Sequence, residues 1–369
     1  YAGTDNAVYF SPNDGKNWIR LKGNLPPAPV YGLAIQKQFG DLVLGTYGRG
    51  FYILDDLTPI REFTEKIQLS DNQLFTLRPA WRFQRVQGTH HERGAFDGQN
   101  PMYGAIINFY QKDTLQKPAD IVIFTMAGDT LRKLKAMNKT GIQRINWDLR
   151  PEAARLPKLK TKPRDKDWVE LDKHGERNIY PWDLDMQPGL NAPLVPAGTY
   201  KVVYVADGKR QEQHVEVKKD PNLNAADKAI QQQYEFGMQL NADIKATVKL
   251  IEELEKNRAA LQKAMTDTKE EAGKREIQQL ENQLFEIESH LLDIHQTGAR
   301  QDNFRNPVQA LERFLALGKE LIMSSGDHPP TDQQVEVHAV TKASLTAAEA
   351  ACKKVLTSAA WRKTMQGKP

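Results

Sequence analysis

Cysteine is nearly absent from this sequence: Cys352 is the only one among 369 residues. A single thiol excludes an internal disulfide framework and a cysteine-based zinc site, and it is compatible with either the cytosol or a secreted bacterial protein. The chain also lacks an apolar run near the ~18 residues that a membrane-spanning helix needs. Its net charge of +4 is spread over many side chains, and no aromatic-and-basic motif accompanies it. We therefore predict neither a membrane span nor nucleic-acid binding.

The usual sequence signatures of catalysis are missing as well. The chain has no Gly-x-Ser-x-Gly elbow, no His-Glu-x-x-His motif and no phosphate-binding glycine loop. The glycines at Gly45, Gly48 and Gly50 lie between two predicted strands with no helix behind them, so their context excludes a dinucleotide site. We predict no cofactor, no catalytic residue and no metal site in this chain.

Three weaker candidates are identified by residue type alone. His90-His91-Glu92 is a possible metal cluster, but neighbouring residues on a strand point to opposite faces and no third ligand is identifiable. Asp55-Asp56 and the pair Asp183 and Asp185 have the carboxylates that glycoside hydrolysis needs. Asp55-Asp56 follows a predicted strand, where carboxylates can hold the chain as it leaves a sheet. None of the three has an identifiable partner geometry.

Residues 1–56 show short β-strand patterns and an internal repeat. Gly3-Thr4 followed by Val8-Tyr9-Phe10 returns as Gly45-Thr46 followed by Phe51-Tyr52-Ile53. The offset from Gly3 to Gly45 is 42 residues, within the period of roughly 40–45 residues of a β-propeller blade. One period and part of another cannot close a ring, which needs about four blades. We therefore predict that residues 1–56 are the closing strands of an incomplete propeller, and that the chain is part of a larger protein.

The first hairpin contains Ser11-Pro12-Asn13-Asp14-Gly15-Lys16-Asn17-Trp18. It resembles the Asp-box (BNR) hairpin, Ser-x-Asp-x-Gly-x-Thr-Trp, with Asn13 and Asn17 replacing Asp and Thr. Ser11 and Asn13 can bond to nearby backbone, Gly15 supplies positive φ, and Trp18 can fill a gap between strands. We interpret these residues as a structural turn and not as a ligand site.

A longer pattern is more specific than the Asp-box alone. After the box come Asn24-Leu25-Pro26, then Asp-Leu-Val-Leu-Gly-Thr-Tyr-Gly-Arg-Gly at 41–50, then Ile53-Leu54-Asp55-Asp56. This order resembles the end of a sortilin-like propeller in the large bacterial extracellular group of BNR-repeat, "glycosyl hydrolase-like" proteins. In that family the usual sequence motif is close to Asp-Leu-Val-(Val/Ala)-Gly-Thr-His-Gly-Arg-Gly. Gly45, Gly48, Arg49 and Gly50 match its structural positions, and Tyr47 replaces the common His.

The resemblance continues to about residue 223. After a connector at 57–73, residues 74–223 carry seven short strand patterns, which favour an Ig-like β-sandwich. Gly141–Asp148 and Pro196–Tyr200 resemble the Ig-like module of FlgD-type and secreted-enzyme C-terminal regions. Within it we predict that Trp147 fills the core and that Asp148 fixes the following loop.

A long insertion at 150–194 interrupts this predicted sandwich. It contains a basic run and three large aromatic residues, Trp168, Tyr180 and Trp182. Long loops in compact domains are either functional or disordered, and exposed aromatic residues favour binding surfaces. We therefore predict Trp168, Tyr180 and Trp182 as candidate binding residues. The alternative is that they clamp the loop onto the sandwich or onto a neighbouring propeller. The basic run consists of Lys158, Lys160, Lys162, Arg164 and Lys166.

Residues 224–369 change to a helical period. One helix is expected to end near Thr268, and a second carries apolar residues at alternating spacings of three and four from Ile277 to Ile294. That heptad spacing predicts an antiparallel hairpin that packs as a coiled coil. A third helix follows Asn306-Pro307, and Thr331 with Gln334 predicts the capping box of a fourth. Four helices indicate an α-helical bundle.

The predicted fold class is therefore multidomain β plus α: partial propeller blades, an Ig-like sandwich and a helical bundle with a coiled-coil hairpin. The resemblance implies a non-catalytic C-terminal region of an extracellular, periplasmic or outer-membrane-associated bacterial protein. Such a region would be a scaffold that binds protein or glycan, with an upstream propeller segment or a companion chain as its partner. One alternative is the accessory region of an extracellular glycoside hydrolase with its active site on upstream blades. Another is an assembly subunit that docks through the helical hairpin.

Overall fold

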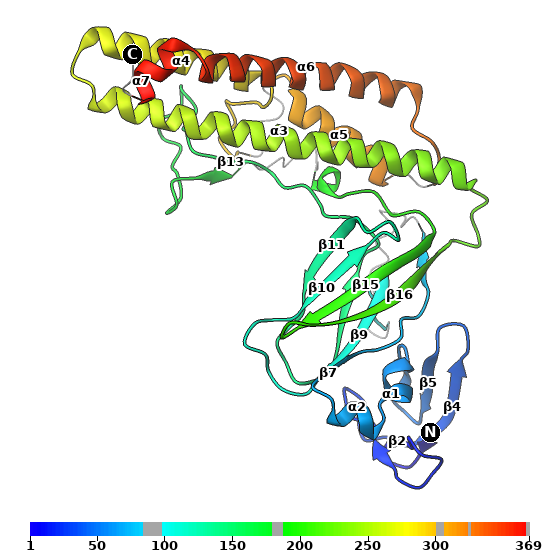
Figure 1. Ribbon diagram of the computed structural model, residues 1–369. Helices are drawn as coiled ribbons and strands as arrows, with labels where there is room; N and C mark the ends of the chain where they lie inside the picture. The colour runs from blue at the N-terminus through cyan, green and yellow to red at the C-terminus, as the bar shows by residue number, and fades with distance from the viewer. Residues whose placement is uncertain (84–97, 179–186, 300–305, 324–325, 367–369) are drawn as a thin grey trace. The chain divides into compact units, whose positions relative to one another are not determined.

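The computed structural model describes residues 1–83, 98–178, 187–299, 306–323 and 326–366 (Figure 1). It is a mixed α/β structure, with small antiparallel sheets in the N-terminal part and a helical region in the C-terminal part. The chain forms two compact units. In described residues, the β unit contains 1–83, 98–150 and 195–223, and the helical unit contains 151–178, 187–194 and 224–366.

The β unit begins with two three-stranded sheets, in the orders β1-β2-β3 and β4-β5-β6. The short strand patterns read in residues 1–56 are confirmed, and β2 to β6 form there. A shared apolar core of Val8, Val30, Leu42, Leu44 and Leu57 supports them. The strands are β1 Ala2–Gly3, β2 Val8–Phe10, β3 Ile19–Arg20, β4 Val30–Gln36, β5 Asp41–Thr46 and β6 Gly50–Leu54.

The turn between β2 and β3 has the hydrogen bonds that its residues predict. The Gly15 backbone N donates to Ser11 Oγ at 2.7 Å, and the Asn17 backbone N donates to Asn13 Oδ1 at 2.8 Å. Gly15 has a φ of +87°, a conformation that glycine adopts without steric cost. Trp18 has half of its surface exposed, because it precedes the edge strand β3 rather than filling a gap between strands.

Two short helices, α1 Thr58–Glu62 and α2 Glu65–Leu69, lead into two further sheets, one of three strands and one of five. One has the order β12-β9-β7 and the other the order β11-β10-β15-β16-β8. All neighbours are antiparallel except β16 and β8. The strands are β7 Asn72–Leu74, β8 Ala80–Arg82, β9 Ala105–Gln111, β10 Asp120–Phe124, β11 Thr130–Lys135, β12 Gly141–Trp147, β15 Gly198–Ala206 and β16 Lys209–Lys219.

Aromatic pairs join these two sheets. Trp147 of β12 is fully buried and its ring lies 5.4 Å from that of Tyr200 in β15, while Phe109 of β9 lies 5.2 Å from Tyr204. The Trp147 indole N–H donates to the Arg150 carbonyl at 2.9 Å. Gly104 packs against the same residue: a Cβ there would lie 2.0 Å from the Trp147 carbonyl oxygen. Trp147 thus occupies the core position expected for it.

The sequence pattern at 74–83 predicts one strand, and this prediction is wrong. The structure has two short strands that pair in different sheets, β7 with β9 and β8 with β16. Pro79 lies between them and has no backbone N–H for a ladder, so the chain changes sheets at this point.

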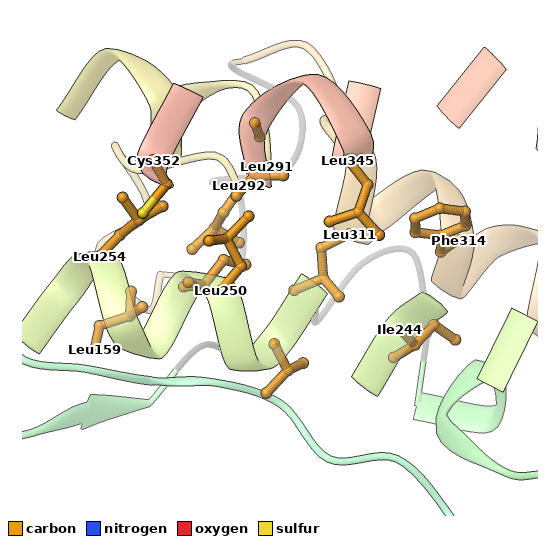
Figure 2. Close-up of a cluster of buried hydrophobic side chains, with 14 of the residues drawn as sticks. Leu159, Ile244, Leu250, Leu254, Leu291, Leu292, Leu311, Phe314, Leu345 and Cys352 are labelled. Atoms are coloured by element: carbon orange, nitrogen blue, oxygen red, sulfur yellow. The ribbon is translucent and has the colours of Figure 1, made fainter. Parts of the chain in front are cut away.

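The helical unit contains five helices in its described residues. α3 and α4 follow one another through a short link and pack side by side, and α5 and α6 complete an apolar core (Figure 2). The predicted end near Thr268 is confirmed, as is the capping box of Thr331 and Gln334. The helices are α3 Asp227–Asp267, α4 Glu271–Ser289, α5 Ala310–Met323, α6 Asp332–Leu356 and α7 Ala359–Gln366.

Part of the insertion packs into this helical core. It contributes β13 Lys158–Leu159, β14 Arg177–Asn178 and the 3-10 turn η1 Gln187–Leu190. Leu159 is fully buried among helix side chains (Figure 2). At Gly189 a Cβ would lie 2.0 Å from the Leu315 carbonyl oxygen, so η1 approaches the backbone of α5 directly. None of the helices in the described ranges is long and apolar enough to cross a membrane.

Candidate functional site

One face of the β4-β5-β6 sheet is apolar and exposed. Directly paired residues share a face, so Gly32, Gly45 and Phe51 lie together, next to Ala34, Val43 and Ile53. The opposite face carries the buried Leu42 and Leu44. Phe51 is 82% exposed and Ile53 is 61% exposed. We name Gly32, Ala34, Val43, Gly45, Phe51 and Ile53 the outer sheet face.

Two tyrosines and two glycines shape this surface. Tyr31 and Tyr47 are both exposed beside it, with ring centroids 5.9 Å apart. A Cβ added at Gly32 or Gly45 would meet atoms no closer than 3.8 Å, which is ordinary contact. The chain's own packing therefore does not require glycine at either position. Neither residue has a side chain, so together they form a glycine strip, and the Phe51 ring packs against it with Cε1 3.8 Å from the Cβ position at Gly45.

The turn after β5 contains the other glycines of the motif. Gly48 and Gly50 have φ values of +76° and +73°, so their role is the conformation of this turn. Arg49 between them is exposed at the tip. These motif residues therefore position β6, and with it Phe51 and Ile53, in the sheet.

The carboxylates after β6 hold the chain where it leaves the sheet. Asp56 is buried with a φ of +58°, and its side chain accepts hydrogen bonds from the Asn108 amide at 2.6 Å and the Thr58 backbone N at 3.1 Å. The Asp56 backbone N donates to Asp41 Oδ1 at 2.8 Å. Burial, then the nearby charge of Asp41, raises the pKa of Asp55. These contacts assign the pair a structural role.

Arginine side chains link the same segment to later parts of the β unit. Arg144 of β12 donates to the Asp55 carbonyl at 2.6 Å and to Asn108 Oδ1 at 3.1 Å. Arg78 donates to Asp41 Oδ1 and to the Phe39 carbonyl, both at 2.8 Å. The β4-β5-β6 sheet is therefore anchored to the rest of its unit from its inner side and ends, which leaves the outer sheet face uncovered.

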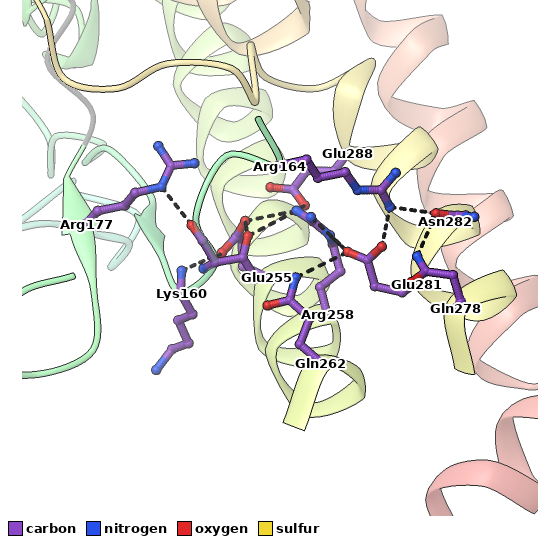
Figure 3. Close-up of polar contacts among 11 residues, drawn as sticks. Lys160, Arg164, Arg177, Glu255, Arg258, Gln262, Gln278, Glu281, Asn282 and Glu288 are labelled. Carbon is purple, nitrogen blue, oxygen red and sulfur yellow. Dashed lines mark hydrogen bonds and ion pairs between the residues drawn. The ribbon is translucent and has the colours of Figure 1, made fainter. Parts of the chain in front are cut away.

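The helical unit contains a buried ion cluster, which we define as Glu255, Arg258, Glu281 and Glu288 (Figure 3). Arg258 and Glu255 come from α3, and the two other glutamates come from α4. The Arg258 guanidinium lies 2.8 Å from Glu288 Oε2, 2.9 Å from Glu281 Oε1 and 3.2 Å from Glu255 Oε1. One cation thus joins three carboxylates between the two helices.

The electrostatics of the ion cluster follow from its burial. Burial by itself would lower the pKa of Arg258, but the charges of Glu288 and Glu255 outweigh it and raise the pKa. Burial, followed by the charge of Glu255, raises the pKa of Glu288 well above its ordinary value. The cluster therefore resists loss of its arginine proton and favours protonation of one carboxylate.

The insertion is attached to the helices through this cluster. Thr161 donates to Glu255 twice, from its backbone N at 2.6 Å and from Oγ1 at 2.7 Å. Arg177 donates to the Thr161 carbonyl at 2.8 Å and to the Gln296 carbonyl at 2.6 Å. Burial lowers the pKa of Arg177. The arrangement satisfies charged groups inside a helix hairpin and is a structural device.

The basic run of the insertion is largely engaged within the helical unit. Arg164 pairs with Glu281 and stacks 3.5 Å from the centre of the Phe285 ring. Lys158 and Lys160 both pair with Glu176, at 2.9 and 3.7 Å. These side chains neutralise acids of the same unit rather than forming a free basic patch.

Of the three predicted binding aromatics, only Trp168 can be placed. It is 69% exposed. Tyr180 and Trp182 lie outside the described residues, as do the metal candidate His90-His91-Glu92 and the carboxylates Asp183 and Asp185. Within the ranges that the structure describes, no group of three or more His, Cys, Asp or Glu residues is placed to hold a metal ion.

Sequence reasoning missed the ion cluster, although a signal was available. Glu281 and Glu288 are seven residues apart, so they follow the heptad that carries the apolar seam of α4. Glu255 and Arg258 are one turn apart on α3. Charged residues that keep the period of the core indicate a buried network.

Comparison with known proteins finds no matching family model, no matching curated protein and no matching solved structure. The function of the chain must therefore be inferred from its own residues and their geometry.

Proposed function

We propose that this chain is a non-catalytic scaffold, the C-terminal region of a secreted bacterial BNR-propeller protein. Its first sheets are the closing strands of the propeller, followed by an Ig-like sandwich and a helical bundle whose α3 and α4 form a coiled-coil hairpin. The neighbouring propeller sheet comes from an upstream segment of the same protein or from a companion chain. The observation that carries the proposal is the exposed, apolar outer sheet face.

Elementary energetics favour a covered outer sheet face. Full burial of a Phe or Ile side chain contributes about 1.5–3 kcal/mol, and Phe51 and Ile53 are mostly exposed in this chain. Two sheets pack face to face at about 10 Å, and the glycine strip at Gly32 and Gly45 suits such an approach. An apolar sheet face left in water is also an aggregation hazard, so a protein sheet is the occupant that best fits its chemistry.

The finer domain assignments are supported by the contacts already described. Two sheets joined by Trp147–Tyr200 and Phe109–Tyr204 pairs are consistent with a sandwich. The seam of α4, with Ile277, Leu280 and Leu284 buried, is consistent with coiled-coil packing on α3. Trp168 is the one predicted binding aromatic within the described residues, and an exposed tryptophan suits a protein or glycan ligand.

The test is the mass of the protein purified from its source, measured under native and then denaturing conditions. We expect upstream Asp-box repeats, either in a companion polypeptide or in a longer chain. For a companion, the double variant Phe51→Asp, Ile53→Asp should abolish association. Met126→Asp, at an exposed site elsewhere in the β unit, should leave it intact. A lone species of the size of this chain would contradict the proposal.

The alternative of a glycoside hydrolase accessory region rests on the resemblance alone. Its described carboxylate candidates, Asp55 and Asp56, are engaged in the contacts that fix the end of β6. A catalytic base on upstream propeller blades would favour this alternative, whereas sugar cleavage by this chain by itself would overturn the scaffold proposal.

A further inference from the structure

Helix α6 is apolar on two opposite sides. Its inner side carries the buried residues Thr341, Leu345, Ala348 and Cys352. The side opposite them is exposed, yet between its two charged ends it presents alanine and valine, and Val340 is 56% exposed. A helix that is apolar on both sides is normally covered on both. We define the α6 outer face as Glu336, Ala339, Val340, Ala343, Ala347, Ala350 and Lys354.

The same bundle shows what its solvent-facing surface normally contains. α4 also has one buried seam, and its exposed side is formed by polar or charged residues. The α6 outer face departs from this composition along most of its length. The exposed residues of α4 include Arg275, Glu276, Gln279, Gln283 and Glu286.

The α6 outer face is complementary to itself when reversed. Glu336 and Lys354 are 18 residues apart, about five turns, so they lie on one line along the helix. If two copies pack antiparallel about a two-fold axis at the level of Leu345, Glu336 of one copy lies level with Lys354 of the other. By the same symmetry Ala343 lies level with Ala347.

Val340 then lies level with Ala350, so apolar residues meet apolar residues and the acid meets the base at both ends. A parallel arrangement would instead bring Glu336 against its own copy and Lys354 against its own copy, which is unfavourable. We propose that the α6 outer face is an interface between two copies of this chain, related by a two-fold axis and antiparallel at α6.

The small side chains permit close approach, and a groove beside them offers further contact. Helices pack 8–10 Å apart, with the shorter distances at small residues. A groove of about 420 Å³ lies alongside and shares Ala347 with the face. It is also lined by Ile287 of α4 and His290 directly after it, by Ala310 and Arg313 of α5, and by Ala351 of α6.

The size of the surface sets the expected affinity. From Glu336 to Lys354 the helix is about 27 Å long, and with a contact width of about 10 Å it covers roughly 270 Å² per copy. A standard interface buries about 800 Å² per partner. The dimer is therefore weak, and it dissociates on dilution through the micromolar range.

The first test is sedimentation velocity of the full chain from low micromolar to several hundred micromolar concentration. The wild-type chain should shift from monomer to dimer. Ala343→Glu, which places two carboxylates at the centre of the interface, should raise the dissociation constant at least tenfold. The matched control Gln283→Glu adds the same charge on the polar side of α4 and should leave it unchanged. Circular dichroism should show equal helix content in all three proteins.

The second test reverses the end charges. Glu336→Lys and Lys354→Glu should each weaken the dimer, because each places like charges level with one another. The double variant Glu336→Lys, Lys354→Glu should restore it in the antiparallel arrangement. A wild-type chain that stays monomeric over the whole range would overturn the proposal. So would dimerisation unaffected by Ala343→Glu, or a double variant no better than the single ones.

Discussion

Removal of the Arg258 guanidinium should strongly destabilise the helical unit. In Arg258→Met the side chain keeps its length and apolar stem but loses its charge, so Glu255 and Glu288 lose their cation and Glu281 keeps only Arg164. Removing one partner of a buried ion pair costs about 3–5 kcal/mol, because the remaining charge is left unpaired in a poorly solvated site. Arg258 and its three partners are all nearly inaccessible, so we expect a loss of about that size.

A comparison within the same cluster sharpens this prediction. Glu288→Gln preserves volume at a residue whose pKa is already raised by burial, so its cost should be far smaller, about 1 kcal/mol. The surface control Arg275→Met lies on the exposed side of α4 and should change the free energy of unfolding by no more than about 0.5 kcal/mol.

The assay is urea unfolding followed by circular dichroism at the helix band, with limited proteolysis as a local readout. Because Thr161 is attached to Glu255 of the cluster, the insertion should be cleaved faster in Arg258→Met. If Arg258→Met costs less than about 1 kcal/mol, or no more than Glu288→Gln, the assignment of Arg258 as the residue that balances the buried carboxylates is refuted.

Two further predictions concern pH and backbone geometry. Burial raises the pKa of Glu312 from 4.5 to about 7. The protonated Glu312 carboxyl therefore stabilises the folded state fully below pH 4.5. This stabilisation, about 3 kcal/mol, is lost as the pH rises through 7. Glu312→Gln should remove that part of the pH dependence of unfolding, and an unchanged slope would contradict it. In the β unit, Gly104→Ala should cost more than about 2 kcal/mol, because its Cβ would collide with the Trp147 carbonyl oxygen at a φ of +116°. The control Gly128 also has a positive φ, +100°, but open space around its Cβ position, so Gly128→Ala should reduce the free energy of unfolding by less. Tryptophan fluorescence during denaturation compares the two variants. Equal losses of stability would contradict the predicted collision.

Local patterns predicted the helices better than the sheets. The heptad of α4 and the capping box of Thr331 with Gln334 depend only on residues within a few helical turns, so the local sequence is enough to predict them. The split of residues 72–82 into β7 and β8 depends on pairing with β9 and β16, which lie far away in the chain. α7 was not predicted because its eight residues are too few to show a clear hydrophobic periodicity.

The candidate site shows the same division. The turn residues around Gly15, Gly48 and Gly50 could be read from sequence because positive φ favours glycine locally. The ion cluster was missed although Glu281 and Glu288 follow the heptad of α4, because a charged residue on a helix is ordinarily assigned to the solvent side. Its attachment to Thr161, which is 94 positions from Glu255, could not be predicted from local patterns. The exposure of Phe51 and Ile53 could not be predicted either, because a strand with apolar residues on both faces is normally buried on both faces.

The central claim is that a neighbouring sheet covers the outer sheet face. Hydroxyl-radical footprinting can compare the protein purified from its source with this chain expressed alone, using Tyr31, Tyr47 and Phe51 as probes and exposed Met126 as the reference. The account predicts that all three probes react rapidly in the chain alone and are protected in the purified protein, while Met126 reacts equally in both. Equal reactivity of Phe51 in the two samples would contradict the claim.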